Sequence, residues 1–164
     1  MHLRLPLPLP LLLTMNFRFV WVGKTRNKNY LALQEEYLRR LSHFVKYETV
    51  EIRDSAHPQG KEIEGKRILE KLNHTPFVCL LDVMGRGLSS PELANEIEKW
   101  QHLGTKEISF VLGGADGVAP QVAQRADLVL SLSILTFTHE MARVVMLEQL
   151  YRAFTIIKGF PYQK

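Results

Sequence analysis

The chain has 164 residues, of which 46% are hydrophobic and 23% charged, as expected of a globular protein with one domain and a sizeable core. Its formal net charge of +4 permits a nucleic-acid partner without requiring one. The single cysteine, Cys79, excludes an internal disulfide and suits a reducing compartment, and its place in the apolar run FVCLL predicts a core residue rather than a nucleophile.

Residues 1–14 (MHLRLPLPLPLLLT) are apolar but too short to span a membrane, and their three prolines interrupt any helix. The stretch has no small-residue cleavage site, so we expect a disordered leader or a misassigned start, with a short export signal as the alternative. Met15 then precedes a regular strand pattern, and residues 15–164 are expected to form a single domain.

The first half of this domain alternates between strand and helix patterns. We expect strands at 16–22 and 47–53 and helices at 27–45 and 61–72. The first helix has an apolar stripe made by Tyr30, Leu33, Tyr37, Leu41 and Phe44. Arg39 and Arg40 lie off this stripe, which indicates solvated charges or, alternatively, RNA contacts. His57 falls in the turn-rich loop 54–60 and is expected at the surface.

The second half continues the alternation. We expect strands at 77–83, 108–112 and 129–132. We also expect one helix that begins near residue 89 and two more at 120–126 and 139–154. Two starts are open for the helix near residue 89: Ser89 can form a capping box with Glu92, or Ser90 can cap with Pro91 at the first helical position. The rhythm as a whole predicts an α/β fold with a mostly parallel sheet flanked by helices.

The last helix, HEMARVVMLEQLYRAF, is apolar around most of its circumference. A helix of this kind needs two partners, and we expect its own sheet on one side and a second copy of the chain on the other. Glu148 and Arg152 have the i, i+4 spacing of a helical ion pair.

Two loops follow neighbouring apolar strands in the C-terminal half. Gly113, Gly114 and Gly117 follow the strand at 108–112, and the run Leu132 to Phe137 follows the next strand. Glycine lets the backbone approach a ligand closely or take a positive φ. Because loops at the carboxyl ends of parallel strands form the crevice where α/β sheets bind ligands, these two loops are the candidate site. For each loop alone, the alternative is a tight turn and a helix start.

The sequence contains no GxxxxGK[ST] phosphate loop, no GxGxxG fingerprint, no GxSxG elbow, no CxxC and no HExxH. We therefore predict no metal site. The glycines, backbone groups and small hydroxyls of the two loops suit a neutral or zwitterionic cofactor that is held mainly through the backbone.

Four ordered motifs, LDVMGRGLSSPELA, FVLGGADGV, LSLSILTFTHEMARVVMLEQLYRAF and GFPY, closely resemble those of the RlmH-type (YbeA-like) methyltransferases of the SPOUT class. These enzymes methylate a pseudouridine in large-subunit (23S) ribosomal RNA, and the resemblance covers residues 15–164. It implies a C-terminal trefoil knot, a cytoplasmic homodimer packed through the terminal helix, and a ribosomal RNA or ribosome substrate. No membrane or metal partner is implied.

The same resemblance implies that S-adenosylmethionine binds in the knot. The cofactor residues carried over are Leu81, Gly113, Leu132, Ser133, Ile134, Leu135, Thr136 and Phe137, beside Gly114 and Gly117 of the glycine loop. The catalytic candidates are His139, Arg143, Tyr162 and Gln163. The family ends in Tyr-His-Arg or Tyr-His-Lys, whereas this chain ends in Tyr162-Gln163-Lys164, and glutamine cannot act as a base at neutral pH.

The sequence is compatible with three hypotheses. The first is a methyltransferase that uses S-adenosylmethionine on N3 of a pseudouridine in assembled ribosomes. The second is a catalytically silent RNA- or ribosome-binding protein with the same fold, for which Gln163 is the hint. The third is a small-molecule α/β enzyme with no RNA partner.

Overall fold

The computed structural model describes residues 15–162, so the expected leader 1–14 and the tail residues Gln163 and Lys164 lie outside the described part. Within it, the strands are β1 (Asn16–Val22), β2 (Lys46–Ile52), β3 (Phe77–Gly87), β4 (Glu107–Leu112) and β5 (Leu128–Ser131). The helices are α1 (Lys28–Leu41), α2 (Gly60–Lys71), α3 (Ser90–His102), α4 (Pro120–Arg125) and α5 (His139–Lys158).

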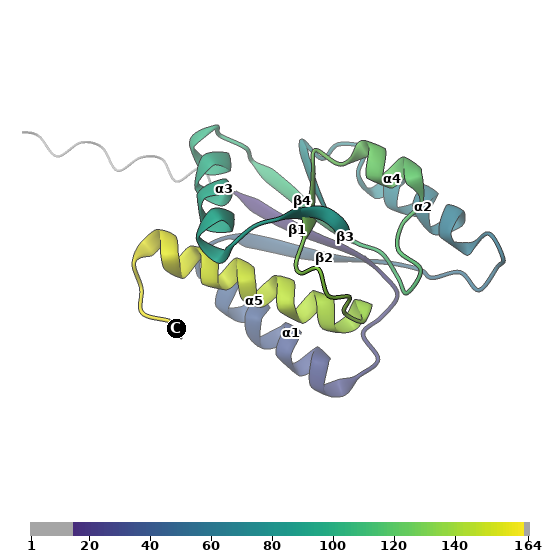
Figure 1. Cartoon of the computed structure of the whole chain (residues 1–164), viewed down its shortest axis with the longest axis horizontal. Coiled ribbons are helices and arrows are strands. Elements are labelled where there is room, and N and C mark those ends of the chain that lie inside the picture. The colour runs from purple at the N-terminus through teal and green to yellow at the C-terminus, as the bar shows by residue number, and fades with distance from the viewer. Residues whose placement is uncertain (1–14, 163–164) are drawn as a thin grey trace, which may run out of the picture.

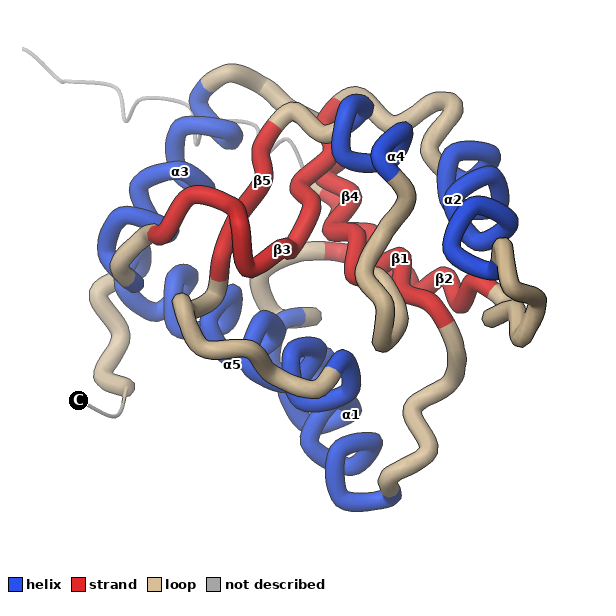
Figure 2. The backbone as a smooth tube through the Cα atoms, turned by 45° about the vertical axis from the view of Figure 1, so that its right-hand side comes forward, coloured by secondary structure: helices blue, strands red, loops and turns tan. Residues whose placement is uncertain are grey.

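The five strands form one parallel sheet in the order β2-β1-β4-β3-β5. Helices α1, α3 and α5 cover one face of the sheet and α2 and α4 cover the other, as Figures 1 and 2 show. The predicted α/β fold with a parallel sheet flanked by helices is confirmed. Because all strands run the same way, their carboxyl ends gather at one edge of the sheet.

The larger core layer, beneath α1, α3 and α5, is built on aromatic side chains. Phe17, Phe19, Phe110 and Phe154 are fully buried, and the Phe17 and Phe110 ring centroids are 4.9 Å apart in an edge-to-face arrangement. These rings come from the central strands β1 and β4 and from α5, so they join the middle of the sheet to the terminal helix. Cys79 is completely buried in the same layer, as predicted.

Helix α1 is shorter than predicted, and the C-terminal half of its predicted apolar stripe packs against the core while Leu33 does not. Its buried residues are Gln34, Leu38 and Leu41, whereas Leu33 of the predicted stripe is 43% exposed. The physical reason is polar: the Gln34 amide donates to Thr25 Oγ1 at 2.8 Å, and this contact brings a polar residue to the buried side. Apolar periodicity alone could not indicate that orientation.

Strand β3 continues four residues beyond the predicted end at Val83. It pairs with β5 up to Leu81, loses register, and pairs again from Arg86. A Cβ atom on Gly85 would lie 2.7 Å from the Val129 carbonyl oxygen, so only glycine lets the two backbones approach here. The residues between the two paired stretches bulge from the sheet at its carboxyl edge.

Helix α5 is longer than predicted and ends at Gly159, whose φ of 68° is the left-handed cap conformation. It packs between α1 and α3 in the layer on one face of the sheet (Figure 1). These two helices flank α5 within the subunit, and the packing of a second copy against its remaining surface stays a prediction. Among residues 15–162, no helix, α5 included, is both long enough and apolar enough to cross a membrane.

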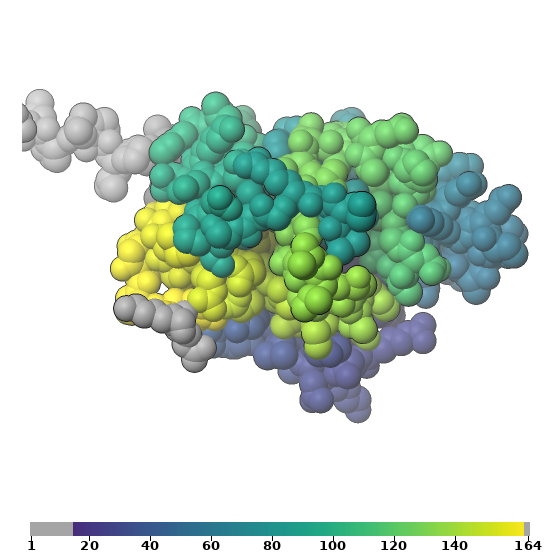
Figure 3. All heavy atoms as spheres, in the orientation of Figure 1, coloured from purple at the N-terminus to yellow at the C-terminus, as the bar shows by residue number. Residues whose placement is uncertain are grey.

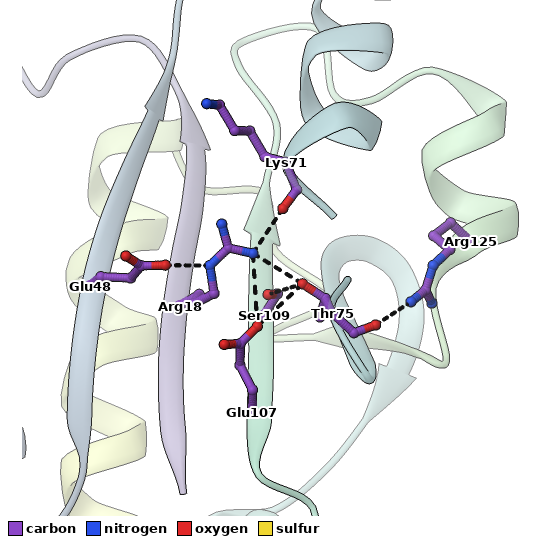
Figure 4. A network of polar contacts seen from close by, with 7 residues as sticks. All are labelled: Arg18, Glu48, Lys71, Thr75, Glu107, Ser109 and Arg125. Carbon is purple, nitrogen blue, oxygen red and sulfur yellow. Dashed lines mark hydrogen bonds and ion pairs between the residues drawn. The ribbon is translucent and has the colours of Figure 1, made fainter. Parts of the chain in front are cut away.

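A polar network holds the opposite, amino edge of the sheet (Figure 4). The Arg18 guanidinium donates to the Lys71 carbonyl at 2.8 Å and to Thr75 Oγ1 at 3.0 Å, and it pairs with the Glu48 carboxylate. Arg125 donates to the Thr75 carbonyl at 2.7 Å. The network ties the α2–β3 connection to the sheet on the edge that lies away from the candidate loops.

The start of α3 resolves the two open alternatives. Ser89 is the N-cap, and its Oγ accepts from the Glu92 N–H at 3.2 Å. The Glu92 carboxylate accepts from the Ser89 N–H at 2.7 Å, which completes the capping box. Hydrogen bonds from the Ser89 backbone and side chain lower the pKa of Glu92.

Ser89→Ala is expected to lower the free energy of unfolding by about 1 kcal/mol, because the Glu92 N–H at the start of α3 loses its acceptor, Ser89 Oγ. Urea unfolding of the variant and the parent measures this. Asn95→Ala, on an exposed position of the same helix, is the control and should change stability much less. An equal effect of the two substitutions would remove the capping box from the account of helix stability.

Candidate active site

A cavity of about 580 Å³ opens at the carboxyl edge of the sheet, where β3, β4 and β5 end. Its lining comes from the end of β3, the glycine loop, the loop after β5 and the first turn of α5. The lining residues are Leu81, Asp82, Val83, Leu112, Gly113, Gly114, Ala115, Asp116, Gly117, Leu132, Ser133, Leu135, Thr136, Phe137, Thr138, His139 and Ala142. This size is ordinary for a small-molecule or cofactor site.

The glycine loop folds tightly upon itself. Gly117 has a φ of 77°, and its N–H donates to the Gly114 carbonyl at 3.1 Å. A Cβ atom on Gly113 would lie 2.6 Å from the Gly117 backbone, so Gly113 is required by the chain's own turn. Its glycine therefore need not imply close approach of a ligand, as the sequence suggested, and a Gly113→Val variant would test the loop's folding rather than binding.

The loop after β5 is held by its own serines. Ser131 Oγ donates to the Ser133 carbonyl at 2.8 Å, and Ser133 Oγ accepts from the Leu135 N–H at 3.0 Å. These contacts turn the chain so that Leu135 and Phe137 reach the cavity while the Ile134 side chain is 94% exposed. In Figure 3 this loop, in yellow-green, lies beside the teal atoms of the β3 end.

Nine of the ten predicted cofactor residues line this cavity; Ile134 does not. The residues that the sequence reading missed include two carboxylates, Asp82 and Asp116. Asp82 could have been identified from the sequence, because it interrupts the apolar run of β3. In the structure its Oδ1 accepts from the Met84 N–H at 2.8 Å in the bulge. No lysine or arginine is among the lining residues, so the wall is acidic and suits a ligand that carries positive charge.

The four catalytic candidates do not gather at one place in the subunit. His139, the first residue of α5, lies in the cavity wall. Arg143 is fully buried one turn later and does not line the cavity. Its guanidinium donates to the Val22 carbonyl and, at 2.9 Å, to Thr25 Oγ1. Arg143 therefore cannot touch a substrate in this arrangement.

Tyr162 lies beyond the other end of α5, a helix of 20 residues and about 30 Å. Its ring packs edge-on against Tyr151, with centroids 4.9 Å apart, and its hydroxyl is 3.3 Å from that of Tyr37. Burial and the hydrogen bond with Tyr37 raise the pKa of the Tyr162 phenol, so it stays neutral at physiological pH. Gln163 lies outside the described residues.

Within residues 15–162, no group of three or more histidine, cysteine or acidic side chains is arranged to hold a metal ion. His57 lies in an exposed loop, and its Nδ1 accepts from the Gln59 N–H at 3.1 Å. Burial raises the pKa of the Cys79 thiol, which leaves it protonated and inert. The cavity at the carboxyl edge is thus where the predicted site residues come together.

Solved structures share the fold. A probable methyltransferase from Bordetella pertussis Tohama I aligns with a TM-score of 0.59 at 11% identity, covering 85% of this chain and 96% of that one. A probable methylase family protein from Haemophilus influenzae Rd KW20 aligns with a TM-score of 0.56 at 14% identity, covering 92% and 71%.

Sequence comparison is more specific. Residues 15–163 match the family described as "Predicted SPOUT methyltransferase". Proteins named ribosomal RNA large subunit methyltransferase H are 40% identical in Limosilactobacillus reuteri and 41% identical in Clostridioides difficile, and each alignment covers 88% of this chain and 97% of the relative. The chain belongs to the SPOUT methyltransferases and, within them, to the methyltransferase H family.

Proposed function

We propose that the protein transfers a methyl group from S-adenosylmethionine to N3 of a pseudouridine in 23S ribosomal RNA, acting on assembled ribosomes in the cytoplasm. The coarser part, methylation of large-subunit ribosomal RNA, is supported by family membership and by the names of the relatives. The observation that carries the proposal is the acidic cavity built from the glycine loop, the loop after β5 and His139. A C-terminal trefoil knot, typical of the family, belongs to the same proposal.

The residues of the cavity fit this cofactor by charge and by lining. When bound, S-adenosylmethionine supplies an electrophilic methyl group on a sulfonium. Asp82 and Asp116 offset positive charge, and the absence of lysine and arginine from the lining disfavours phosphate-bearing nucleotides. The backbone of residues 113–117 and 132–137 would hold the polar groups, and Leu81, Leu112 and Leu135 supply apolar surface.

The protein's own residues must align the base for an in-line attack and accept the imide proton. His139 lies in the cavity wall at the start of α5, and we assign the imide proton to its imidazole. Tyr162 keeps its proton and can stack on a base or donate a hydrogen bond. Arg143, although it matches a family position, does not meet the substrate.

His139 and Tyr162 stand at opposite ends of α5, so one subunit cannot bring them to the same substrate. A homodimer in which the tail of one subunit meets the cavity of the other resolves this separation. Exposed apolar side chains near the tail, Ile156 and Phe160, line a second hollow with Ser90 and Gln149. We propose that this surface, at the C-terminal end of α5, drives dimer formation.

The test of function is tritiated methyl transfer from S-adenosylmethionine to ribosomes that lack the modification. Ala142 is half-buried in the cavity wall, so Ala142→Phe should fill the cavity and lower both cofactor affinity and methyl transfer at least tenfold. Ala32→Phe, on an exposed position of α1, is the matched control and should leave both unchanged. Nucleolytic mapping then locates the label.

Parent protein that binds the cofactor and the ribosome yet transfers no methyl group would support the catalytically silent alternative. Label on a small molecule but never on ribosomal RNA would support the third hypothesis. Normal binding by folded Ala142→Phe would remove this cavity from the proposal.

Ile156→Asp is expected to shift the protein from dimer to monomer at micromolar concentration, because it puts a charge on the proposed apolar interface. The side chain is 43% exposed within the subunit, so the subunit itself should keep its fold. Leu31→Asp, at 42% exposure on α1, is the control. Light scattering measures both masses, and a parent protein of monomer mass would overturn the dimer.

Deletion of residues 162–164 should leave cofactor affinity and dimer mass nearly unchanged but lower methyl transfer at least tenfold, about 1.4 kcal/mol of barrier. Gln163→His should preserve or raise the rate, since it restores the tail of the family. The assay is the same tritium transfer. A truncated protein as fast as the parent would show that the tail is a frayed terminus outside the site.

A further inference from the structure

Two charged residues near the start of α5, Glu140 and Arg143, both form hydrogen bonds with the segment that joins β1 to α1. Glu140 Oε1 accepts from the backbone N–H groups of Arg26 and Asn27, the latter at 3.1 Å. Arg143 donates to the Val22 carbonyl and to Thr25 Oγ1. Glu140 and Arg143 are three residues apart, so both project from the same side of the helix.

The residues beside them near the start of α5, His139 and Ala142, line the cavity. On one side of the helix, Glu140 and Arg143 are hydrogen-bonded to residues 22–27. On the other side, His139 and Ala142 line the cavity. Any rotation or shift of α5 about its axis would move both sides together, because a helical turn is rigid over this length. The hydrogen bonds of Glu140 and Arg143 therefore fix the position of the cavity wall that His139 and Ala142 form.

Val22 extends the connection to the opposite wall. Its carbonyl accepts from Arg143, and its side chain lies against the glycine loop: a Cβ atom on Gly114 would be 3.4 Å from Val22 Cγ1. Val22 is itself 2% exposed at the end of β1. The last residue of β1 thus contacts both α5 and the glycine loop, which are two walls of the same cavity.

Burial of a guanidinium is costly unless its contacts are good. Arg143 is completely buried, and among the described residues its Nε has no hydrogen-bond partner, so packing alone would favour an apolar side chain. Its guanidinium lies 5.0 Å from the centroid of Trp21, and burial lowers the pKa of Arg143 to about 10, so it remains charged at neutral pH. Burial would raise the pKa of Glu140, but the Asn27 and Arg26 N–H groups outweigh it and lower that pKa.

We propose that Glu140 and Arg143 are positioning residues: by gripping residues 22–27 they hold the first turn of α5 and, through Val22, the glycine loop in the geometry that binds the cofactor. Neither side chain lines the cavity, so they act through His139, Ala142 and Gly114. The part of this inference that concerns S-adenosylmethionine rests on the proposed function; the mechanical link between the two walls does not.

The first experiment is calorimetry with S-adenosylmethionine on Glu140→Ala, Arg143→Met and Glu140→Gln. Glu140→Ala and Arg143→Met should raise Kd at least fivefold, since each frees one attachment of the turn. Glu140→Gln should stay within twofold, because the amide oxygen can still accept from both N–H groups. In methyl transfer, KM for the cofactor should rise with Kd, while KM for the ribosome stays constant.

The second experiment needs no cofactor. Backbone hydrogen exchange should accelerate at residues 113–117 in Arg143→Met, although the substitution lies on another element. Arg18→Met is the matched control, because Arg18 also donates to one backbone carbonyl and one threonine hydroxyl, but at the amino edge of the sheet (Figure 4). It should lower stability without changing exchange at 113–117 or cofactor affinity.

The proposal is overturned if folded Glu140→Ala binds S-adenosylmethionine with unchanged affinity and shows unchanged hydrogen exchange at residues 113–117. Because Glu140→Ala gives both measurements, the test does not require Arg143→Met to fold. A parent protein that fails to bind S-adenosylmethionine would instead contradict the proposed function. In that case hydrogen exchange alone decides whether the two walls are linked. Faster exchange at residues 113–117 in the α5 variants would support the link, and unchanged exchange would contradict it.

Discussion

The site depends on the contact between the backbones of β3 and β5 at Gly85. There a side chain as small as a methyl group would collide with the Val129 carbonyl. Because glycine permits the approach, β3 can leave the sheet after Leu81 and return to pair with β5 at Arg86. The intervening bulge brings Asp82 and Val83 into the cavity wall. The end of β5 then delivers the loop from Leu132 onward to the same place.

The sequence predicted most of this architecture because parallel strands buried on both faces read as apolar runs between turn residues. Strand β1 was predicted with its observed bounds, and the cap at Ser89 was one of two alternatives. Prediction failed where contacts between residues distant in the sequence decide the outcome. Gln34 turns α1 toward Thr25, and α5 finds α1 and α3 as neighbours, which no periodicity within either helix reveals.

The site was predicted to a similar depth. Loop chemistry after two strands located the cavity, since glycines and small hydroxyls mark chain reversals at the carboxyl edge. It could not tell that Gly113 serves its own turn, that Ile134 faces solvent, or that Arg143 points into the core. These are matters of side-chain direction, which depends on tertiary packing. The split of His139 and Tyr162 between the two ends of α5 also required the helix to be seen at its full length.

The acidic wall has a consequence for the end of the catalytic cycle. On the proposed reaction, methyl transfer turns a sulfonium into a neutral thioether, so the spent cofactor carries one positive charge less than the fresh one. Once His139 has released the accepted proton to solvent, Asp82 and Asp116 have lost a favourable electrostatic partner, and no lysine or arginine lines the cavity to compensate. The same charges that attract the donor therefore weaken retention of the by-product, and turnover is favoured by electrostatics without any moving lid. The ratio of the two dissociation constants, and its decrease in Asp82→Asn, would report this discrimination directly.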